Sequence, residues 1–180
     1  GADVADLGAG EGSVFSETMW EEAETDDIIV GLRALTFDVT PDRSWSSVAW
    51  AGANRNHDMQ SELIKHERST HWVVAEIGGI LARNPKMARR VYCVPGGQAV
   101  TLESAFTRAG IELIILGRSD YAGAAGQYHA GCGDEDELTA EDPSPRIFHT
   151  AAPGQTPLHV AIGGAVWTKD KAPVWDAIRS

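Results

Sequence analysis

The sequence is poor in cysteine, and Cys93 and Cys132 are too few to form a disulfide framework. Cys93 lies in the apolar run at residues 91–94, so we expect it to be a buried free thiol. No run of about 20 apolar residues is present, so we expect no membrane-spanning helix. The first residues lack the positively charged start and apolar core of a signal peptide, and we therefore expect none.

Positive charge is also scarce. Fifteen Lys and Arg stand against 26 Asp and Glu, which gives a formal net charge of −11. This charge disfavours nucleic acid as a partner unless a local basic patch binds it. The one candidate patch is residues 82–90 (ARNPKMARR), which we interpret as a solvated helix end and loop. A hydrophobic fraction of 43% is typical of a globular protein, and 180 residues suit a single domain.

Residues 4–15 (VADLGAGEGSVF) have the pattern of a ligand-binding turn, in which a short apolar strand runs into several glycines. Such glycines permit positive φ and let the backbone approach a ligand closely. A helix is expected over residues 13–24, and its N-terminus would offer unpaired N–H groups to an anionic ligand. A second interpretation stays open, because residues 1–15 are small, acidic and Gly-rich, as extended flexible arms in assemblies are.

Further along the chain, strand and helix patterns alternate. Residues 28–39 are apolar and β-branched and predict a strand that ends near Asp38. Residues 57–68 have helical composition and apolar residues at helical spacing, which predicts a helix. Residues 44–53 and 72–82 are each compatible with either a strand or a helix.

The clearest unit spans residues 91–117. It reads as a strand (91–94), a Pro-Gly-Gly turn, a helix (98–110) stopped by a glycine, and a second strand (111–117). A unit of this length fits a right-handed parallel crossover.

The last third of the chain begins with residues 120–145, which are rich in Gly, Ala and acids and predict a long acidic loop. Residues 145–151 and 158–168 predict two strands joined by a Pro/Gly turn, and residues 172–179 predict a short helix. The fold that we expect is a single α/β domain over residues 1–180, with a Rossmann-like, mostly parallel sheet and an antiparallel C-terminal edge.

Two segments together resemble the class I S-adenosylmethionine-dependent methyltransferases. Residues 6–12 (DLGAGEG) resemble the first motif of that family, and residues 35–42 (LTFDVTPD) resemble its second strand. The resemblance implies that the chain binds S-adenosylmethionine as a small-molecule cofactor and transfers its methyl group. The cofactor-binding residues that it implies are Asp6, Gly8, Gly10, Gly12 and Asp38.

The sequence also departs from that family. Only 52 residues separate Asp38 from Val91, which is short for two further strands and their crossovers. No Asn-Pro-Pro-Tyr or Asp-Pro-Pro-Tyr acceptor motif is present, so the catalytic residues and the methyl acceptor stay unknown. Whether the chain is an enzyme is therefore open. The alternative is a non-enzymatic structural or assembly subunit of a virion or other multimeric particle, with oligomerisation expected. The expected location is the cytoplasm, or the virion under the alternative.

Two other groups of side chains attract attention. A metal-like cluster comprises His129, Cys132, Asp134 and Asp136, but its spacing lacks a second pair of soft ligands, so we expect a solvated acidic loop and no metal. Possible acid, base and nucleophile residues are His66, Glu67, His71, Ser69 and Ser104. No nucleophile-elbow pattern surrounds either serine, so we expect all five to be surface or packing residues.

Overall fold

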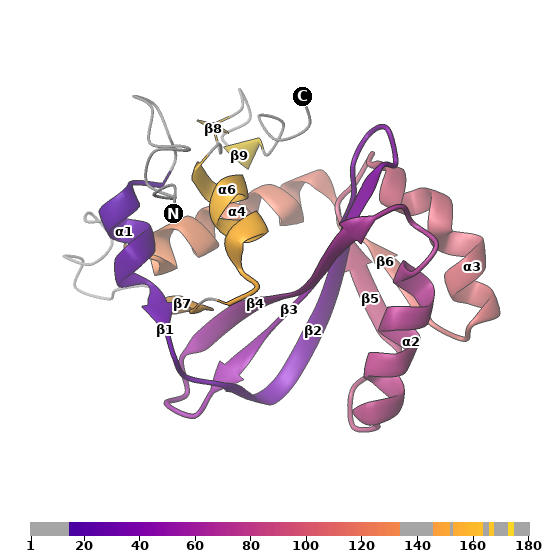
Figure 1. Ribbon diagram of the computed structural model, residues 1–180, viewed down its shortest axis with the longest axis horizontal. Coiled ribbons are helices and arrows are strands. Elements are labelled where there is room, and N and C mark those ends of the chain that lie inside the picture. The colour runs from indigo at the N-terminus through magenta and orange to yellow at the C-terminus, as the bar shows by residue number, and fades with distance from the viewer. Residues whose placement is uncertain (1–14, 134–145, 152, 164–165, 168–172, 175–180) are drawn as a thin grey trace.

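The computed structural model describes residues 15–133, 146–151, 153–163, 166–167 and 173–174 (Figure 1). Its centre is a seven-stranded sheet in the order β1-β7-β4-β3-β2-β5-β6. The strands of this sheet are β1 (Glu24–Thr25), β2 (Ile29–Val39), β3 (Trp45–Asn54), β4 (Met59–Arg68), β5 (Arg90–Cys93), β6 (Glu112–Ile115) and β7 (Ile147–Thr150). The helices are α1 (Glu17–Glu22), α2 (Val73–Arg83), the 3-10 helix η2 (Gln98–Leu102), α3 (Glu103–Arg108), α4 (Arg118–Gly131) and α6 (Thr156–Gly163). A separate small antiparallel sheet consists of β8 (Val166–Trp167) and β9 (Pro173–Val174).

The side chains of β2 alternate between the two faces of the sheet, and those on one face are part of the main core. Leu35, Phe37 and Val39 point to one face of the sheet and are at most 2% exposed, while the residues between them face the other side. The buried face packs against α2, η2 and α3, where the ring of Phe106 lies 5.1 Å from that of Phe37. The strand predicted over residues 28–39 is confirmed, because its β-branched and apolar pattern suits a strand covered on one face.

The three long strands β2, β3 and β4 form an antiparallel meander. The prediction of a helix over residues 57–68 is wrong, since His57 takes a positive φ of 67° in a tight turn and β4 follows directly. Helix preference is a weak signal that tertiary pairing overrides. Here β4 pairs with β3 along most of its length, and that pairing decides the structure.

The α/β class is confirmed, but the antiparallel part of the sheet is not at the C-terminal edge. β5 pairs parallel with β2 and β6, and β7 pairs parallel with β4 and β1, whereas the antiparallel pairs join β2, β3 and β4. The Rossmann-like label is not confirmed by this arrangement. An antiparallel hairpin needs only a short turn, while a parallel crossover needs a dozen residues or more. A meander followed by one helix therefore fits into the 52 residues between Asp38 and Val91.

The strand–helix–strand unit at residues 91–117 is confirmed. β5 and β6 pair in parallel, and η2 and α3 connect them on the core side of the sheet. Gly110 has a φ of 66° and follows the end of α3, as expected for a helix-stopping glycine. Cys93 is 1% exposed, so the prediction of a buried free thiol is also confirmed.

The opposite face of the sheet is approached by α4, which Figure 1 shows running behind α6 toward α1. The hydroxyl of Tyr128 in α4 lies 2.8 Å from Ser61 Oγ of β4. A second apolar cluster forms here from Phe15, Trp20, Ala23 and Cys132. The predicted loop at residues 120–145 is thus helical as far as Gly131, because packing against this cluster favours an Ala-rich helix, and residues 134–145 lie outside the described residues.

Three smaller expectations also change. α1 begins at Glu17, and its N-cap is Ser16, whose side chain accepts a hydrogen bond from the N–H of Met19. The helix α6 lies where a strand was predicted from residue 158, and residues 173–174 form β9 where a helix was predicted.

None of the helices within the described ranges is long and apolar enough to cross a membrane. That the whole chain is one domain stays a prediction.

Candidate functional site at the carboxyl end of the central strand

Asp38 lies at the edge of the sheet where three parallel strands end. It is the penultimate residue of β2, and its half-buried side chain is on the face opposite Phe37 and Val39. β5 and β6 run parallel to β2, so their carboxyl ends lie at the same edge as Asp38. Open α/β sheets bind ligands at the carboxyl ends of their strands. The candidate site is therefore built from Asp38 and the loops that follow β5 and β6.

The loop after β5 passes close to Asp38 at a glycine. A Cβ atom placed on Gly97 would lie 3.9 Å from Asp38 Oδ1. The backbone of Gly97 is extended, with φ −89° and ψ 174°, a conformation that any residue adopts. The loop after β6 leads into α4, which carries Asp120 in its first turn. The loop after β5 (Val94, Pro95, Gly96 and Gly97) has no acidic residue.

The thiol of Cys93 lies at the end of β5 but is not available as a ligand or nucleophile. Burial, together with the negative charges of Asp38 and Glu103, raises the pKa of this thiol to about 11. The thiolate, not the thiol, is the reactive and metal-binding form. Cys93 is therefore a protonated packing residue at neutral pH.

A row of polar side chains crosses the sheet from Asp38. Asp38 pairs with Ser47 of β3, and Ser47 pairs with His66 of β4. Directly paired residues of antiparallel strands project to the same face, so all three lie on the face of Asp38. Ser47 Oγ is 2.7 Å from His66 Nδ1, and this hydrogen bond fixes the imidazole ring. Partial desolvation lowers the pKa of His66 below its ordinary value.

The described residues do not contain a complete metal centre. No group of three or more His, Cys, Asp and Glu side chains in them is arranged to hold a metal ion. Asp38 offers hard carboxylate oxygens of the kind that Mg²⁺ and Mn²⁺ prefer, but it is one ligand of several that such an ion needs. The described part of the chain thus supplies a partial ligand set.

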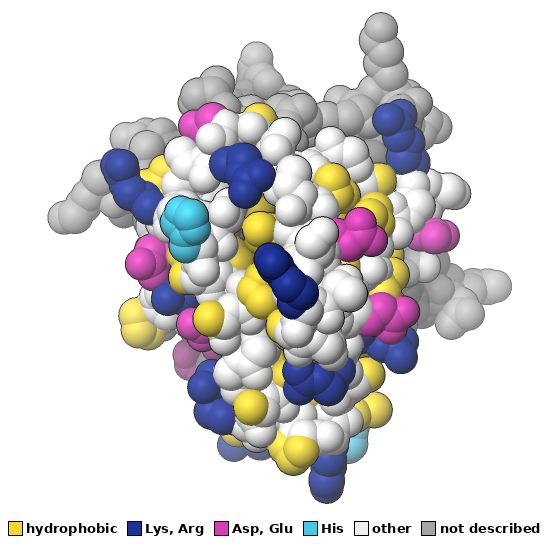
Figure 2. Space-filling model, turned by 90° about the vertical axis from the view of Figure 1, so that its right-hand side faces the viewer, with side chains coloured by type: hydrophobic (Ala, Val, Ile, Leu, Met, Phe, Trp, Pro, Cys, Tyr) yellow, Lys and Arg dark blue, Asp and Glu magenta, His cyan; other side chains and the backbone are white. Residues whose placement is uncertain are grey.

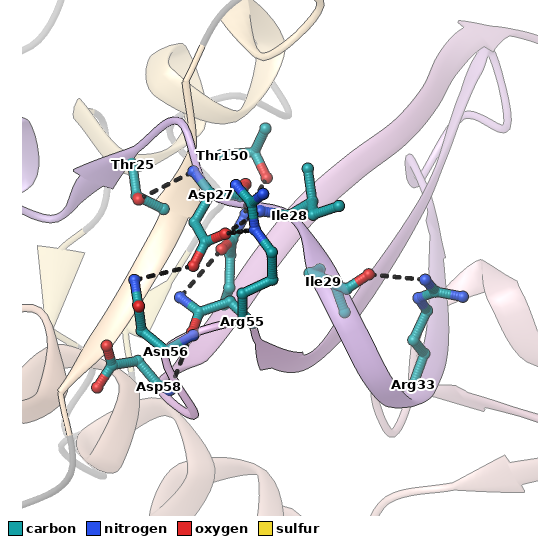
Figure 3. A network of polar contacts seen from close by, with 11 residues as sticks. Thr25, Asp27, Ile28, Ile29, Arg33, Arg55, Asn56, Asp58 and Thr150 are labelled. Carbon is teal, nitrogen blue, oxygen red and sulfur yellow. Dashed lines mark hydrogen bonds and ion pairs between the residues drawn. The ribbon is translucent and has the colours of Figure 1, made fainter.

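A second polar cluster lies at the other end of β2 and holds the fold together (Figure 3). Asp27 accepts hydrogen bonds from Arg55 Nε at 2.6 Å and from Asn56 Nδ2 at 3.0 Å. Gln60, which is 1% exposed, donates to the backbone oxygen of Asp27 and to Thr150 Oγ1. These bonds tie the β3–β4 turn and β7 to the segment before β2. The cluster therefore has a structural role.

A cleft of about 380 Å³ opens beside this cluster, and its larger side chains interact with one another. The guanidinium of Arg33 lies 4.4 Å from the centre of the Trp50 ring, and Trp50 Nε1 donates a 2.7 Å hydrogen bond to Glu62. Arg33 also bonds Asn84 Oδ1 and the carbonyl of Ile29. These contacts fasten the N-terminal half of β2 to the end of α2, so we assign the cleft no catalytic role.

The other candidate residues of the sequence analysis do not come together as a site. Asp6, Gly8, Gly10, Gly12, Asp134 and Asp136 lie outside the described residues. Of the metal-like cluster, His129 and Cys132 are described, and burial raises the pKa of the Cys132 thiol to about 12. His66 and Glu67 are neighbours on β4, so their side chains project to opposite faces. Sequence reasoning missed the partnership of His66 with Ser47, because it assigned His66 to a helix.

Comparison with known proteins assigns the fold. No family model and no curated protein sequence matches the chain. Among solved structures, the HK97 bacteriophage large terminase is similar with a TM-score of 0.59 and 11% identity, over 90% of this chain and 39% of that one. The chain thus spans about two fifths of that terminase. The manganese-bound nuclease domain (K428A mutant) of the large terminase subunit gp2 of bacterial virus Sf6 has a TM-score of 0.51 and 10% identity, over 90% of this chain and 87% of that one. The calcium-bound form of the same Sf6 domain gives 0.54 and 11%, with the same coverage.

These likenesses overturn the methyltransferase resemblance. The chain shares its fold with terminase nuclease domains over nine tenths of its length, and those domains are described with manganese or calcium. The assignment of S-adenosylmethionine as the cofactor is therefore wrong. The alternative of a purely structural assembly subunit is not supported either. The glycine-rich segment misled the interpretation because a short glycine pattern occurs in many turns.

Proposed function

We propose that the chain is a metal-dependent nuclease domain of the kind found in phage large terminases, acting on phosphodiester bonds of DNA. The observation that carries the proposal is the fold shared with the isolated Sf6 nuclease domain over most of both chains, with Asp38 at the carboxyl end of the central strand. Under this proposal, the fold is of the RNase H-like type. The proposal replaces the methyltransferase expectation.

The role of Asp38 in this proposal is to bind a divalent cation. A Mg²⁺ or Mn²⁺ site in enzymes that act on phosphates uses one or two carboxylates and completes its coordination with waters and substrate oxygens. Such a cation supplies Lewis-acid chemistry to the phosphoryl group. With one carboxylate in the described site, binding of the cation would depend strongly on the substrate.

The uneven distribution of charge supports a nucleic-acid substrate despite the net charge of −11. Residues 83–118 contain six basic and two acidic residues, whereas residues 17–27 contain six acidic and no basic residues. Figure 2 shows Lys and Arg side chains spread over the face of the molecule that lies to the right in Figure 1. The repulsion of a phosphate backbone is therefore concentrated away from α2, α3 and β6. The predicted cytoplasmic or virion location is compatible with this proposal and stays a prediction.

The test is a DNA cleavage assay of the full chain with Mn²⁺, Mg²⁺ or EDTA. We expect cleavage with Mn²⁺, and we expect Asp38→Asn to reduce it by about 100-fold or more, because a neutral amide is a much poorer cation ligand. Glu112→Gln is the matched control, since Glu112 is exposed at the opposite end of β6 and should leave the rate unchanged. A folded wild-type protein that cuts no DNA with either metal would refute the proposal, as would full activity in Asp38→Asn.

A further inference from the structure

Three side chains beside Asp38 form an ordered stack on the surface. The rings of Trp45 and His66 are stacked, with their centres 4.9 Å apart and their planes at 5°. The guanidinium of Arg68 lies 5.2 Å from the centre of the Trp45 ring. His66 and Arg68 are exposed, whereas Trp45 is half-buried beneath them. Aromatic and cationic groups are therefore presented together at one place on the sheet.

The stack lies on the same face and at the same end of the sheet as Asp38. Trp45 pairs directly with Arg68, and Asp38, Ser47 and His66 form the neighbouring row across three strands. Neighbouring strands are about 4.8 Å apart, so His66 is about 10 Å across the sheet from Asp38. His66 and Arg68 are two residues apart on β4, which separates them by about 7 Å along the strand.

The stack lies on a part of β4 that the described neighbouring strand does not cover. β7 pairs with β4 only at Met59, Gln60 and Ser61. Farther along, the side chain of Gln155 bonds both backbone groups of Leu63 at 2.9 Å, and the stack follows beyond that point. Exposed cation–π pairs add little to stability. The fold therefore gains little from exposing this group of side chains.

The chemistry of the stack suits a phosphate backbone. A guanidinium binds phosphate oxygens through two parallel hydrogen bonds, and stacking on an aromatic ring restricts its orientation before a ligand arrives. The hydrogen bond between Ser47 Oγ and His66 Nδ1 restricts the orientation of the His66 ring in the same way. Donors that are already fixed lose less conformational entropy when they bind.

We propose that Trp45, His66 and Arg68 form a DNA-contacting surface, in which Arg68 and His66 bind the phosphate backbone, Trp45 holds them in place, and the bound strand is directed toward Asp38. The inference rests on the proposed function, because the partner is the DNA that the nuclease would cut. The three residues are positioning residues. The surface fixes where the strand lies relative to the cation site.

The test measures binding of fluorescein-labelled duplex and single-stranded DNA by anisotropy, with the full chain in EDTA at low ionic strength. We expect Arg68→Gln to weaken binding about tenfold and to lower the slope of log K against log salt by about one. Arg108→Gln is the matched control, because it makes the same charge change at the end of α3, which packs on the face of the sheet opposite the stack. Trp45→Leu keeps the charge and should weaken binding about threefold with the slope unchanged. Circular dichroism checks that each variant is folded.

The outcomes separate this inference from the proposed function. Equal binding by Arg68→Gln and wild type, or equal losses in Arg68→Gln and Arg108→Gln, would overturn the DNA-contacting surface. Failure of the wild-type chain to bind DNA would overturn it as well. Cleavage that requires Asp38 together with binding that ignores Arg68 would leave the nuclease proposal standing and remove the surface. Binding that depends on Arg68, without cleavage in any metal, would support the surface and remove the nuclease.

Discussion

The two ends of β2 have aspartates in different surroundings. Asp27, just before the strand, is bound by Arg55 and Asn56 and caps the N–H of Ile28. Asp38, near the end of the strand, lies beside Gly97 and next to the polar row of Ser47 and His66. The first carboxylate is held by a cation of the protein itself, and the second faces the edge where ligands bind. The same residue type is thus structural before the strand begins, and near its end it is the residue to which the proposed function gives the cation.

The difference follows from how closely the backbone is packed at each end. The N-terminal half of β2 has an irregular register between Ile29 and Arg33, and Gly52 of β3 lies directly against it. The carboxyl end of β2 lies beside Gly97, which has no side chain and so leaves room next to the carboxylate of Asp38. A substitution at Gly52 should therefore lower the stability of the fold, whereas one at Gly97 should change ligand binding.

The largest effect is expected at the packed end, for Gly52→Ala. A Cβ atom there would lie 2.6 Å from the backbone oxygen of Leu32 and 2.9 Å from Ile29 Cγ2, so the backbone of β2 must move. We expect a loss of about 1–3 kcal/mol in the free energy of unfolding, measured by urea denaturation. Gly78→Ala in α2 is the control, because no atom lies within 4 Å of its added Cβ. It should stabilise the protein by up to about 1 kcal/mol. Equal stabilities of the two variants would contradict this account.

A smaller effect, and a gain, is expected at the open end for Gly97→Asp. The extended backbone accepts the new side chain, and its carboxylate would lie near that of Asp38. Two carboxylates bind a divalent cation more tightly than one. We expect affinity for Mn²⁺ to rise about tenfold, which is about 1.4 kcal/mol, in calorimetric titration of the DNA-free protein. The gain should disappear when Asp38→Asn is added. An unchanged Mn²⁺ affinity in the folded variant would show that the loop after β5 does not face the cation site.

The smallest effect is expected for Asp27→Asn, and it should depend on pH. The hydrogen bond from Arg55 is the main cause that lowers the pKa of Asp27 below its ordinary value of 3.8. Because the folded pKa is the lower one, the carboxylate stabilises the fold above the ordinary value, and this contribution is lost as the pH falls through the lowered value. The variant should therefore be less stable than wild type near neutral pH and equal to it in acid, as measured by urea unfolding across that range.

The partner of Asp27 gives the control for that experiment. Arg55→Gln should cause the same loss at neutral pH, and the double variant should lose no more than either single one, because both remove one interaction. Additive losses would assign the stabilisation to other contacts of the two residues.

Local patterns predicted part of this architecture well. The β-branched run of β2 and the unit of β5, α3 and β6 could be predicted because their strands are apolar and bounded by turn residues. The strand β4 could not be predicted, since its sequence MQSELIKHER has the composition of a surface helix. The helix α4 was not predicted because of its glycines, and packing of its Tyr128 against the second apolar cluster stabilises it.

The residues of the candidate site also differ in whether the sequence alone could predict them. Asp38 could be singled out from the sequence because an acid at the end of an apolar strand is a recognisable signal, although the ligand first assigned to it was wrong. The nearness of His66 and Ser47 to Asp38 could not be predicted from the sequence, since it depends on the register of two antiparallel strand pairings. The shortness of the segment between Asp38 and Val91 was a usable signal for a meander.

Local sequence patterns were sufficient to predict the α/β class, the central strand with its aspartate, the parallel unit that follows, and the buried thiol of Cys93. Each of these depends on residues close together in the chain, where periodicity and turn chemistry act directly. Long-range contacts, by contrast, set the pairing of β3 with β4, the helix α4, and the stack of Trp45, His66 and Arg68 near Asp38. The physical reason is that strand pairing and helix packing are contacts between distant segments, whose free energy exceeds the local preferences of the residues involved.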